Sequence, residues 1–568
     1  MTQNKKTIPG AEALMLSLLE EKVETLFGYP GGQIINVFDY LYKYQDQLHH
    51  ILTRHEQGAI HAAQGYARAT GKTGVCVVTS GPGATNLITG IADAMIDSTP
   101  LVCITGQVPV ALLGSDAFQE ADIISMTMPV TKWSYQVTDA SEIPAAIAKA
   151  FFIARTGRPG PVLVDIPKNA QIGQMEFSYT PCESIRSYTL RPAIDKSKID
   201  DAIETINAAQ RPLILLGQGV KLSGAEQKLI EFAEKANIPV ASTLMGLSAM
   251  PSDHPLYMGM VGMHGNIGPN VLTQETDLLI AMGMRFSDRI TGDLKVYASQ
   301  AKVIHVDIDK SEIGKNVKTD IGIHADISDA LDELLQKAQY VDRKDWIAQF
   351  TEKYKFEYKN VIDLIINPTQ DEMTMGEVVK AVTEHTDAQA VVVTDVGQQQ
   401  MIAARYSHFR QTLSFITSGG LGTMGYGLPA AIGAKVGVPD RQVVVFCGDG
   451  GFQMTMQELG TIMQNGIGVK VVILNNGYLG MVRQWQQLFF DRRYSHTELT
   501  NPDFVTIAEA YGIKGRMIES RNDLTEAISE MFADDQPYLL EVRVNREGNV
   551  FPMIPAGAPV SGVIFNEE

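Results

Sequence analysis

The stretch that decides the fold is VVVFCGDGGF at residues 443–452, followed by VKVVILNN at 469–476. Each begins as a continuous apolar run, which indicates a strand buried on both faces, as in a parallel sheet between helix layers. The segment between them predicts a helix over 455–465. A right-handed strand–helix–strand unit makes the strands parallel, so their carboxyl ends share one edge, where open α/β sheets bind ligands. We therefore expect Asp449 and Asn476 to lie close together.

Apolar runs of the same kind alternate with helical stretches along the whole chain of 568 residues. The fold class is therefore α/β, with doubly wound parallel sheets. Segments at 171–195 and 342–372 break this rhythm, and we place linkers there. The sequence thus predicts three domains, at 1–180, 190–345 and 370–568. The expected strands are 75–80, 101–106, 161–167, 212–217, 278–283, 303–309, 391–396, 442–447, 469–474 and 538–544.

Composition narrows the class of partner. The formal net charge is −18, from 65 acidic and 47 basic residues, which disfavours nucleic acid or an anionic membrane. There is no run of 18 apolar residues to span a membrane, and the first 27 residues read as an amphipathic helix rather than a signal peptide. The four cysteines form no C-x-x-C pair, and three lie inside apolar runs, so we expect buried free thiols and a cytoplasmic location. They are Cys76, Cys103, Cys182 and Cys447.

The residues that close the two strands suit a magnesium ion bridging a diphosphate. Mg²⁺ prefers hard oxygen ligands, such as the carboxylate of Asp449 and the amide oxygen of Asn476. Gly448, Gly450 and Gly451 let the backbone approach phosphate oxygens closely. A tight strand-to-helix turn with an asparagine cap is the plainer alternative, and the paired GDG and NN motifs make it less favourable.

The GDGGF and NN motifs together resemble the cofactor signature of thiamine-diphosphate enzymes. The resemblance implies that the backbone carbonyl of Tyr478 completes the protein ligands of Mg²⁺. It also implies a second diphosphate clasp in TDVGQQQ and a support for the bent cofactor in GGLGTMGYGLPAAIGA. Many relatives have histidine where this chain has Gln399, so we expect an amide hydrogen bond there. The further cofactor residues implied are Val396, Gly397, Gln398, Gln399, Gly422, Met424 and Met481.

Glu56 is the candidate activating acid. It lies in RHEQGA at 54–59, at the start of an expected helix, where the helix dipole alone would favour a glutamate. The resemblance implies that Glu56 hydrogen-bonds the aminopyrimidine ring of the cofactor and shares a proton with it. It also implies that Glu56 and Asp449 of one site come from different chains, which requires a homodimer, or a tetramer built from such dimers.

Nine further motifs resemble the catalytic subunit of biosynthetic acetohydroxyacid (acetolactate) synthases, and they cover nearly the whole chain. The resemblance implies decarboxylation of pyruvate and transfer of the remaining two-carbon unit to a second 2-keto acid, in branched-chain amino acid biosynthesis. It also implies a separate regulatory small subunit. The motifs are GYPGG (28–32), TSGPGATN (79–86), GQVP (106–109), DAFQE (116–120), RPGPVLVDIPK (158–168), GMHG (262–265), MRFSDR (284–289), GMVRQWQ (480–486) and FPMIPAG (551–557).

The same resemblance implies roles at the reacting centre. Gly31 and Gln119 face the reacting carbonyl, and Lys168 lines the substrate channel. Arg289 holds the carboxylate of the second keto acid, a task suited to the rigid fork of a guanidinium group. Trp485 shapes the acceptor pocket and favours 2-ketobutyrate. Outside their motifs, each of these would be interpreted as an ordinary surface or core side chain.

The middle domain resembles the FAD site of this family. LLGQGVKLSGA at 215–225 has glycines after a strand, but G-x-G-x4-G is a weak signal by itself. The flavin of this family has no net redox role. A pyruvate oxidase-type flavin oxidoreductase, with the same fold and cofactors, is the alternative function. The implied FAD residues are Arg158, Gly217, Gly219, Gly262, Met263, His264, Gly283, Arg285 and Asp307.

Overall fold

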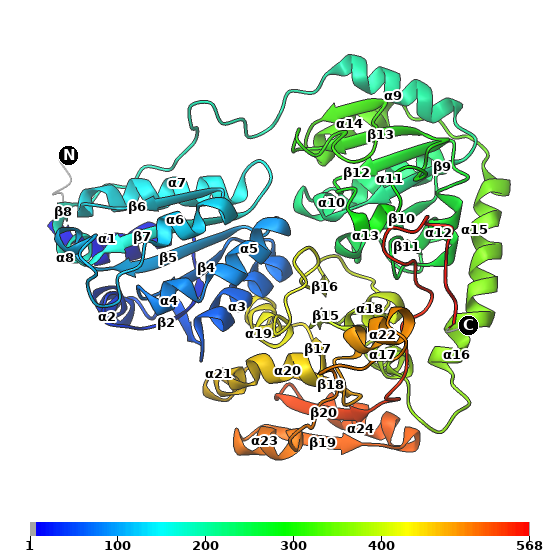
Figure 1. Cartoon of the computed structure of the whole chain (residues 1–568). Helices are drawn as coiled ribbons and strands as arrows, with labels where there is room; N and C mark the ends of the chain where they lie inside the picture. The colour runs from blue at the N-terminus through cyan, green and yellow to red at the C-terminus, as the bar shows by residue number, and fades with distance from the viewer. Residues whose placement is uncertain (1–6, 567–568) are drawn as a thin grey trace.

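The computed structural model describes residues 7–566 and contains three six-stranded sheets, each with every neighbouring pair of strands parallel. Helices cover both faces of the sheets (Figure 1), which confirms the predicted α/β class. The sheets lie inside the three ranges expected from the sequence. A short antiparallel pair, β1 (Thr7–Pro9) and β8 (Gln174–Glu176), joins the two ends of the first domain.

The first sheet has the strand order β3-β2-β4-β5-β7-β6. Its helices include α3, which starts at the carboxyl end of the sheet and ends with Gly71 in the left-handed region (φ +72°). The strands are β2 (Thr25–Tyr29), β3 (His49–Leu52), β4 (Gly74–Val78), β5 (Leu101–Gln107), β6 (Trp133–Gln136) and β7 (Pro161–Pro167). The helices are α1 (Gly10–Glu20), α2 (Ile35–Lys43), α3 (Glu56–Thr70), α4 (Pro82–Thr85), α5 (Ile88–Ile96), α6 (Ile123–Thr127), α7 (Ile143–Arg155) and α8 (Lys168–Ile172).

The middle sheet has the order β11-β10-β9-β12-β13-β14, in which the first strand of the domain is central, as in a dinucleotide-binding fold. The strands are β9 (Pro212–Leu216), β10 (Val240–Ser242), β11 (Tyr257–Met260), β12 (Leu278–Met282), β13 (Lys302–Asp307) and β14 (Ile321–His324). The helices are α9 (Lys196–Ala208), α10 (Gln218–Leu222), α11 (Glu226–Ala236), α12 (Ile267–Leu272), α13 (Asp288–Thr291) and α14 (Ile327–Lys337).

The third sheet has the order β16-β15-β17-β18-β20-β19 and so repeats the arrangement of the first: second, first, third, fourth, sixth and fifth strand of the domain. The strands are β15 (Val391–Thr394), β16 (Phe415–Ile416), β17 (Val443–Gly448), β18 (Val469–Asn475), β19 (Lys514–Ile518) and β20 (Tyr538–Arg543). The helices are α17 (Met375–His385), α18 (Gln398–Tyr406), α19 (Gly427–Gly437), α20 (Asp449–Thr455), α21 (Leu459–Asn465), α22 (Gly480–Phe489), α23 (Phe504–Ala510) and α24 (Leu524–Met531).

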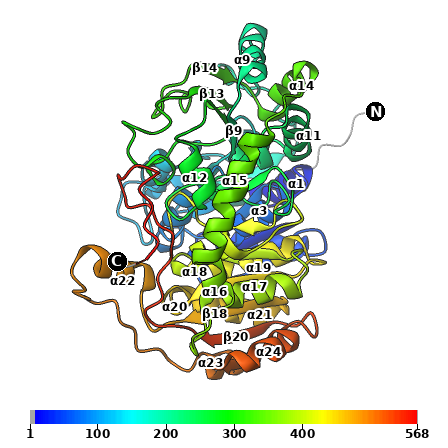
Figure 2. The same cartoon turned by 90° about the vertical axis from the view of Figure 1, so that its right-hand side faces the viewer.

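Two sequence expectations need correction. The segment 342–372 is not a simple linker, because it contains helix α15 (Lys344–Glu357) and the short helix α16 (Asp363–Ile366). Trp346 and Phe350 of α15 pack into the middle domain, and the helix runs from that domain toward the third (Figure 2). The helix expected over 455–465 begins earlier, at Asp449, and is interrupted by a 3₁₀ turn between α20 and α21.

The first and third domains of one chain meet through α3 and α19, which cross closely (Figure 1). A methyl group built on Gly65 would overlap the carbonyl oxygen of Ala430, and one built on Gly433 would overlap that of Ala62. Small residues on both helices therefore permit this approach of backbone to backbone.

Cys76, Cys103 and Cys447 are buried free thiols, as predicted. Among residues 7–566, we find no helix with the length and apolarity needed to cross a membrane.

Candidate cofactor and active site

Asp449 and Asn476 lie at one edge of the third sheet, as predicted. β17 and β18 are parallel neighbours with Gly448 opposite Leu474, so the next residues of both strands emerge together. Asp449 is buried, and burial raises the pKa of its carboxyl group. Asn501, which the sequence did not indicate, donates from Nδ2 to Asp449 Oδ2 over 2.6 Å.

Asn476 faces a small cavity, whereas its neighbour Asn475 is bound inside the sheet by Glu541. Asn476 Nδ2 donates to Gln398 Oε1 over 3.2 Å, and its Oδ1 accepts from the Tyr478 backbone N–H over 3.1 Å. This cavity gathers most residues predicted for the diphosphate end of the cofactor. They are Val396, Gly397, Gln398, Gln399, Met424, Gly448, Asp449, Gly450, Gly451, Asn476, Tyr478 and Met481.

The donor groups of the cavity fit a magnesium diphosphate in their chemistry. A carboxylate, an amide and a backbone carbonyl are oxygen donors of the kind that Mg²⁺ prefers. A methyl group on Gly450 would lie 2.7 Å from Leu479, and one on Gly451 would overlap the carboxylate of Asp395. The glycines therefore let the backbone of this turn pack directly against Leu479 and Asp395 at the wall of the cavity.

Asp395 is a second residue that the sequence analysis missed, although it stands in the quoted TDVGQQQ motif. It ends β15 and accepts backbone hydrogen bonds from Val396 (2.8 Å), Gly425 (3.1 Å) and Gly427 (2.9 Å). Complete burial raises the pKa of Asp395 to about 6, against the opposing effect of these N–H donors. Asp395 thus ties the diphosphate clasp to the glycine-rich segment that carries Met424.

A second group of predicted residues lies at the carboxyl edge of the first sheet. Glu56 begins α3, and its Oε2 accepts from Asn86 Nδ2 over 3.0 Å. Thr79 is the shared neighbour of Gly31 and Gly83, because methyl groups on these glycines would contact it at 2.5 Å and 2.8 Å.

Gln119 and Lys168 belong to the same edge. A methyl group on Gly81 would lie 3.0 Å from the Cα of Gln119, which itself has a positive φ of 63°. Lys168 follows directly on β7 as the first residue of α8. None of Gly31, Glu56, Gln119 and Lys168 lines either the small cavity or the large one described next. One chain therefore presents two separate groups of predicted residues.

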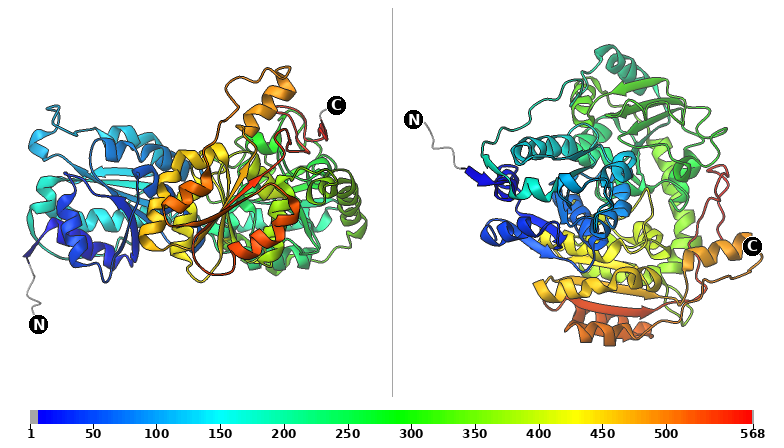
Figure 3. Two further views of the ribbon diagram at one scale, coloured as in Figure 1. Left: turned by 90° about the horizontal axis from the view of Figure 1, so that it is seen from below. Right: turned by 60° about the vertical axis from the view of Figure 1, so that its left-hand side comes forward.

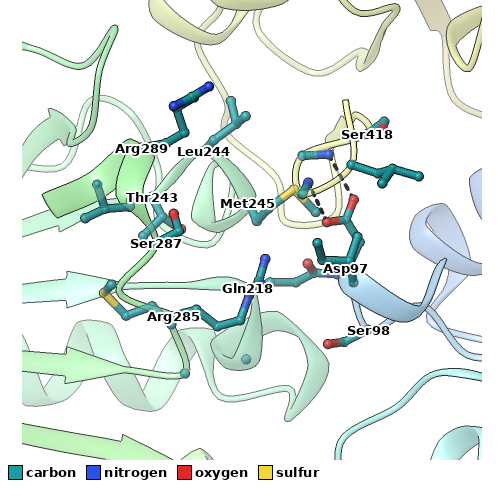
Figure 4. Close-up of a pocket in the computed structure, with 18 of the residues that line it drawn as sticks. Asp97, Ser98, Gln218, Thr243, Leu244, Met245, Arg285, Ser287, Arg289 and Ser418 are labelled. Carbon is teal, nitrogen blue, oxygen red and sulfur yellow. Dashed lines mark hydrogen bonds between the residues drawn. The ribbon is translucent and has the colours of Figure 1, made fainter. Parts of the chain in front are cut away.

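A cavity of about 1050 Å³ lies where the three domains meet. Figure 4 shows Asp97 of the first domain, Met245 of the middle domain and Ser418 of the third around it. Gly217 does not line it; a methyl group there would overlap the carbonyl oxygen of Gly283, so this glycine allows the turn after β9 to pass under β12. The other residues predicted for FAD do line it: Arg158, Gly219, Gly262, Met263, His264, Gly283, Arg285 and Asp307.

Acidic residues of the first domain hold one wall of this cavity. The carboxylate of Asp97 accepts the backbone N–H groups of Gly419 (2.9 Å) and Gly420 (2.8 Å), drawn as dashed lines in Figure 4. Asp97 also pairs with Arg68 over 2.7 Å, with both side chains buried. Asp93 accepts from the hydroxyl of Thr423 over 3.0 Å. This clasp fixes the segment that leads to Gly422, and no sequence motif indicated it.

Arg289 of the middle domain and Trp485 of the third domain both line the large cavity. The side chain of Arg289 is 59% exposed and pairs with Asp288 over 2.7 Å. Trp485 packs against Phe489 with ring centroids 5.1 Å apart. Their helix, α22, stands off the body of the third domain (Figure 3).

Comparison with known proteins agrees with this geometry. Three family models match: "Thiamine pyrophosphate enzyme, N-terminal TPP binding domain" at 8–126, "central domain" at 199–334, and "C-terminal TPP binding domain" at 395–542. The chain is 45% identical to the "Probable acetolactate synthase large subunit" of Methanococcus aeolicus, over 98% of this chain and 95% of that protein. It is also 45% identical to the "Acetolactate synthase isozyme 2 large subunit" of Escherichia coli, over 98% and 99%. The chain belongs to the acetolactate synthase large-subunit family of thiamine pyrophosphate enzymes.

Within the acetolactate synthase family, Gln399 is the departure noted from the sequence. Its side chain is buried, and a methyl group on Gly397 or Gly448 would come within 2.5 Å or 3.0 Å of Gln399 Oε1. The amide therefore occupies the space between the two glycines of the diphosphate clasp. The amide hydrogen bond expected at this position stays a prediction.

Proposed function

We propose that this chain is an acetolactate synthase that decarboxylates pyruvate and transfers the hydroxyethyl unit to a second pyruvate or to 2-ketobutyrate. This is the first common step of valine, leucine and isoleucine biosynthesis. The observation that carries the proposal is that the two cavities share one wall. Val396, Gly397, Met424 and Met481 line both, so the diphosphate edge opens directly onto the cavity that contains Arg289 and Trp485.

At the diphosphate edge, Asp449, Asn476 and the carbonyl of Tyr478 are the proposed ligands of Mg²⁺, which holds thiamine diphosphate. The bound cofactor supplies a nucleophilic carbon and an electron sink for decarboxylation. The role of the chain is to orient it, exclude water and control one proton. Glu56 is the proposed proton-sharing acid, and its carboxylate is oriented by Asn86.

At the acceptor side, Arg289 is the proposed partner of the second substrate's carboxylate, and Trp485 the residue that shapes the pocket. Gly31, Gln119 and Lys168 are proposed to complete the reacting centre. A guanidinium fork recognises a carboxylate through two parallel hydrogen bonds, which a lysine cannot reproduce.

We propose FAD as the occupant of the middle-domain part of the large cavity, without a net redox role. Asp307 ends β13 at the carboxyl edge of the sheet, the edge at which open α/β sheets bind ligands. Burial raises the pKa of Asp307 to about 6, so part of its population accepts a proton near neutral pH. Arg158 reaches the cavity from the first domain and pairs with Asp309 and Glu312, each over 3.1 Å.

We further infer a homodimer, because Glu56 and Asp449 lie in separate groups within one chain. Exposed apolar side chains mark surfaces that another chain would cover. Phe118 beside Gln119 is 83% exposed, and Met454 beyond Asp449 is 54% exposed. Because the relatives are named large subunits, a regulatory small subunit is also proposed, and the free cysteines favour a cytoplasmic location.

The decisive experiment is an acetolactate assay of Glu56→Gln with pyruvate, thiamine diphosphate and Mg²⁺. We expect activity to fall by at least about a hundredfold, since general acid–base help contributes about 10²–10⁴-fold, while cofactor binding is retained. Glu458→Gln is the matched control, because Glu458, the last residue of the 3₁₀ turn between α20 and α21, packs against the start of α3 and accepts from the Arg54 N–H, yet has no proposed role at the cofactor. Full activity of Glu56→Gln would refute the assignment.

The pyruvate oxidase alternative is separated by an anaerobic assay without an electron acceptor. Carboligation needs no oxidant, so acetolactate should form at an undiminished rate. Dependence of turnover on oxygen or another acceptor would favour the oxidase.

A further inference from the structure

A fully buried ion pair, to which the proposed function gives no role, joins helices α18 and α15. Arg405 lies in the last turn of α18, and Glu357 is the last residue of α15. Their side chains are 0% and 1% exposed, and Arg405 Nη2 lies 2.5 Å from Glu357 Oε1. Burying two charges is costly unless their remaining donors and acceptors are also satisfied. The other partners of this pair therefore indicate what it is for.

Those partners lie in one short segment of the middle domain, residues 264–267, which leads into α12. Arg405 Nη1 donates to the backbone carbonyls of His264 (2.9 Å) and Gly265 (2.7 Å). Glu357 Oε2 accepts the backbone N–H of Ile267 over 2.7 Å. The ion pair thus binds the loop from both sides, with carbonyls facing the cation and an N–H facing the anion.

The same loop forms part of the wall of the large cavity. Gly262, Met263 and His264 all line it. The backbone N–H of Met263 donates to the backbone carbonyl of Arg289 over 2.8 Å, so the loop also supports the residue proposed to hold the second keto acid. A shift of the loop would move both the flavin wall and Arg289.

His264 adds an independent sign that this loop meets a polar ligand. Its side chain is 6% exposed, and its Nδ1 is buried without a hydrogen-bond partner in the described structure. Buried polar atoms are rarely left unpaired, so such an atom in a cavity wall indicates a missing partner.

The other end of α18 reaches the diphosphate edge. The helix begins at Gln398, which lines the small cavity, and its next turn contributes Gln400 and Met401 to the large one. Arg405 therefore connects a helix that starts at the thiamine site to the loop that borders the flavin site.

We propose that Arg405 and Glu357 are positioning residues, which hold loop 262–267 in the shape that binds the flavin and that supports Arg289 toward the second keto acid. This inference rests on the proposed function. Neither residue touches substrate or cofactor; both act through the loop.

The test uses Glu357→Gln, which keeps the shape of the side chain and removes its charge. Truncating one member of a buried pair typically weakens the contact it supports by at least about tenfold. We expect the Kd for FAD, from flavin fluorescence titration, and the KM for pyruvate both to rise by about that factor. The Kd for thiamine diphosphate with Mg²⁺ and kcat should stay within about twofold. Glu377→Gln, which breaks a more exposed ion pair with Arg521 (2.6 Å) away from the loop, should change neither Kd for FAD nor KM.

A second variant distinguishes loss of the ion pair from loss of folding. Arg405→Met combined with Glu357→Leu removes both charges at similar volume, a change that usually preserves stability. The double variant should have a Tm near that of the wild type and the same loss of FAD affinity as Glu357→Gln. Arg405→Lys, made alone, should lose less FAD affinity than the double variant.

Three outcomes would overturn the inference or its basis. Unchanged FAD affinity and KM in Glu357→Gln would overturn it. A parallel weakening of FAD and thiamine diphosphate binding with a lower Tm in both the single and the double variant would show a purely structural pair. Failure of the wild type to bind FAD would overturn the flavin assignment, and the KM for pyruvate would then decide whether the pair supports Arg289.

Discussion

Asp449 depends on a residue 52 positions further along the chain. Asn501 Nδ2 donates to its carboxylate over 2.6 Å and to Asn475 Oδ1 over 3.0 Å, so one amide fixes both strand ends. Mutation of a group that orients a metal ligand typically weakens metal affinity by about 10- to 100-fold. Asn501 is therefore the residue-scale support of the proposed Mg²⁺ site.

Replacement of Asn501 by alanine should weaken the metal site without emptying the cavity. We expect the Mg²⁺ concentration for half-maximal activity to rise about tenfold, as for other residues that orient metal ligands. A magnesium titration at saturating thiamine diphosphate measures this. Asn465→Ala removes only a hydrogen bond to the carbonyl of Thr461 in α21 and should leave the titration unchanged. An unaltered midpoint in Asn501→Ala would mean that the amide does not orient Asp449.

Asp395 gives a prediction of pH dependence. Burial raises its pKa to about 6 from the ordinary value of 3.8, so the folded state holds the proton more tightly than the unfolded state. A raised carboxyl pKa adds stability that is present at low pH and is lost as pH rises through the folded value. On lowering the pH from 7.5 to 5, the wild type should gain roughly 1 kcal/mol relative to Asp395→Asn. Urea unfolding of both proteins at the two pH values tests this. A loss of wild-type stability relative to Asp395→Asn on going to pH 5 would contradict the prediction.

At the scale of helices and strands, continuous apolar runs made the buried strands predictable. β17 and β18, buried along nearly their whole length, lie within one residue of the expected bounds. β19 escaped notice because it is an edge strand with one buried residue, and β16 because it has only two residues. Helix α15 was not predicted, because most of its residues are charged or polar and its only buried apolar side chains are Trp346 and Phe350.

The same reasoning explains which parts of the site were predictable. Asp449 and Asn476 end apolar runs of neighbouring strands, so local pattern alone brings them together. The clasp of Asp97 on Gly419 joins residues 322 positions apart, and the pair of Arg405 with Glu357 joins two helices of different domains. Such contacts follow from the packing of domains, which no periodicity in the chain records.

The crossing of α3 and α19 leaves no room for a larger side chain at its glycines. Gly65→Ala places a methyl group on the backbone carbonyl of Ala430, so the helices must separate. We expect a loss of about 3 kcal/mol or more, at the upper end of overpacking effects. Gly268→Ala, also in a helix but with its nearest neighbour 3.5 Å from the added atom, should change stability by less than about 1 kcal/mol. Chemical denaturation compares the two variants, and equal effects would contradict the close crossing.

At the scale of the whole molecule, the question is which chain completes each site. The residues around Glu56 and those around Asp449 form separate groups, and a symmetric dimer would join each group to its counterpart in the partner. A dimer of one chain altered at Glu56 and one altered at Asp449 would then contain one site with both substitutions and one site with neither.

Complementation tests this arrangement. Glu56→Gln and Asp449→Ala should each be nearly inactive alone. After co-expression, random pairing of shared sites should restore about a quarter of the wild-type activity, because half of the dimers are mixed and each has one intact site. No recovery in isolated mixed dimers would show that each site is formed within a single chain.

The common strand order of the first and third sheets has a consequence for the ancestry of the chain. Two domains with the same order of six strands are most simply explained as copies of one ancestral segment, and the middle domain lies between them in the chain. Once copied, neither half needed to bind a whole cofactor. Both copies carry a glycine-rich turn after their third strand, TSGPGATN in the first and GDGGF in the other, and under the proposed function each serves one end of the same cofactor.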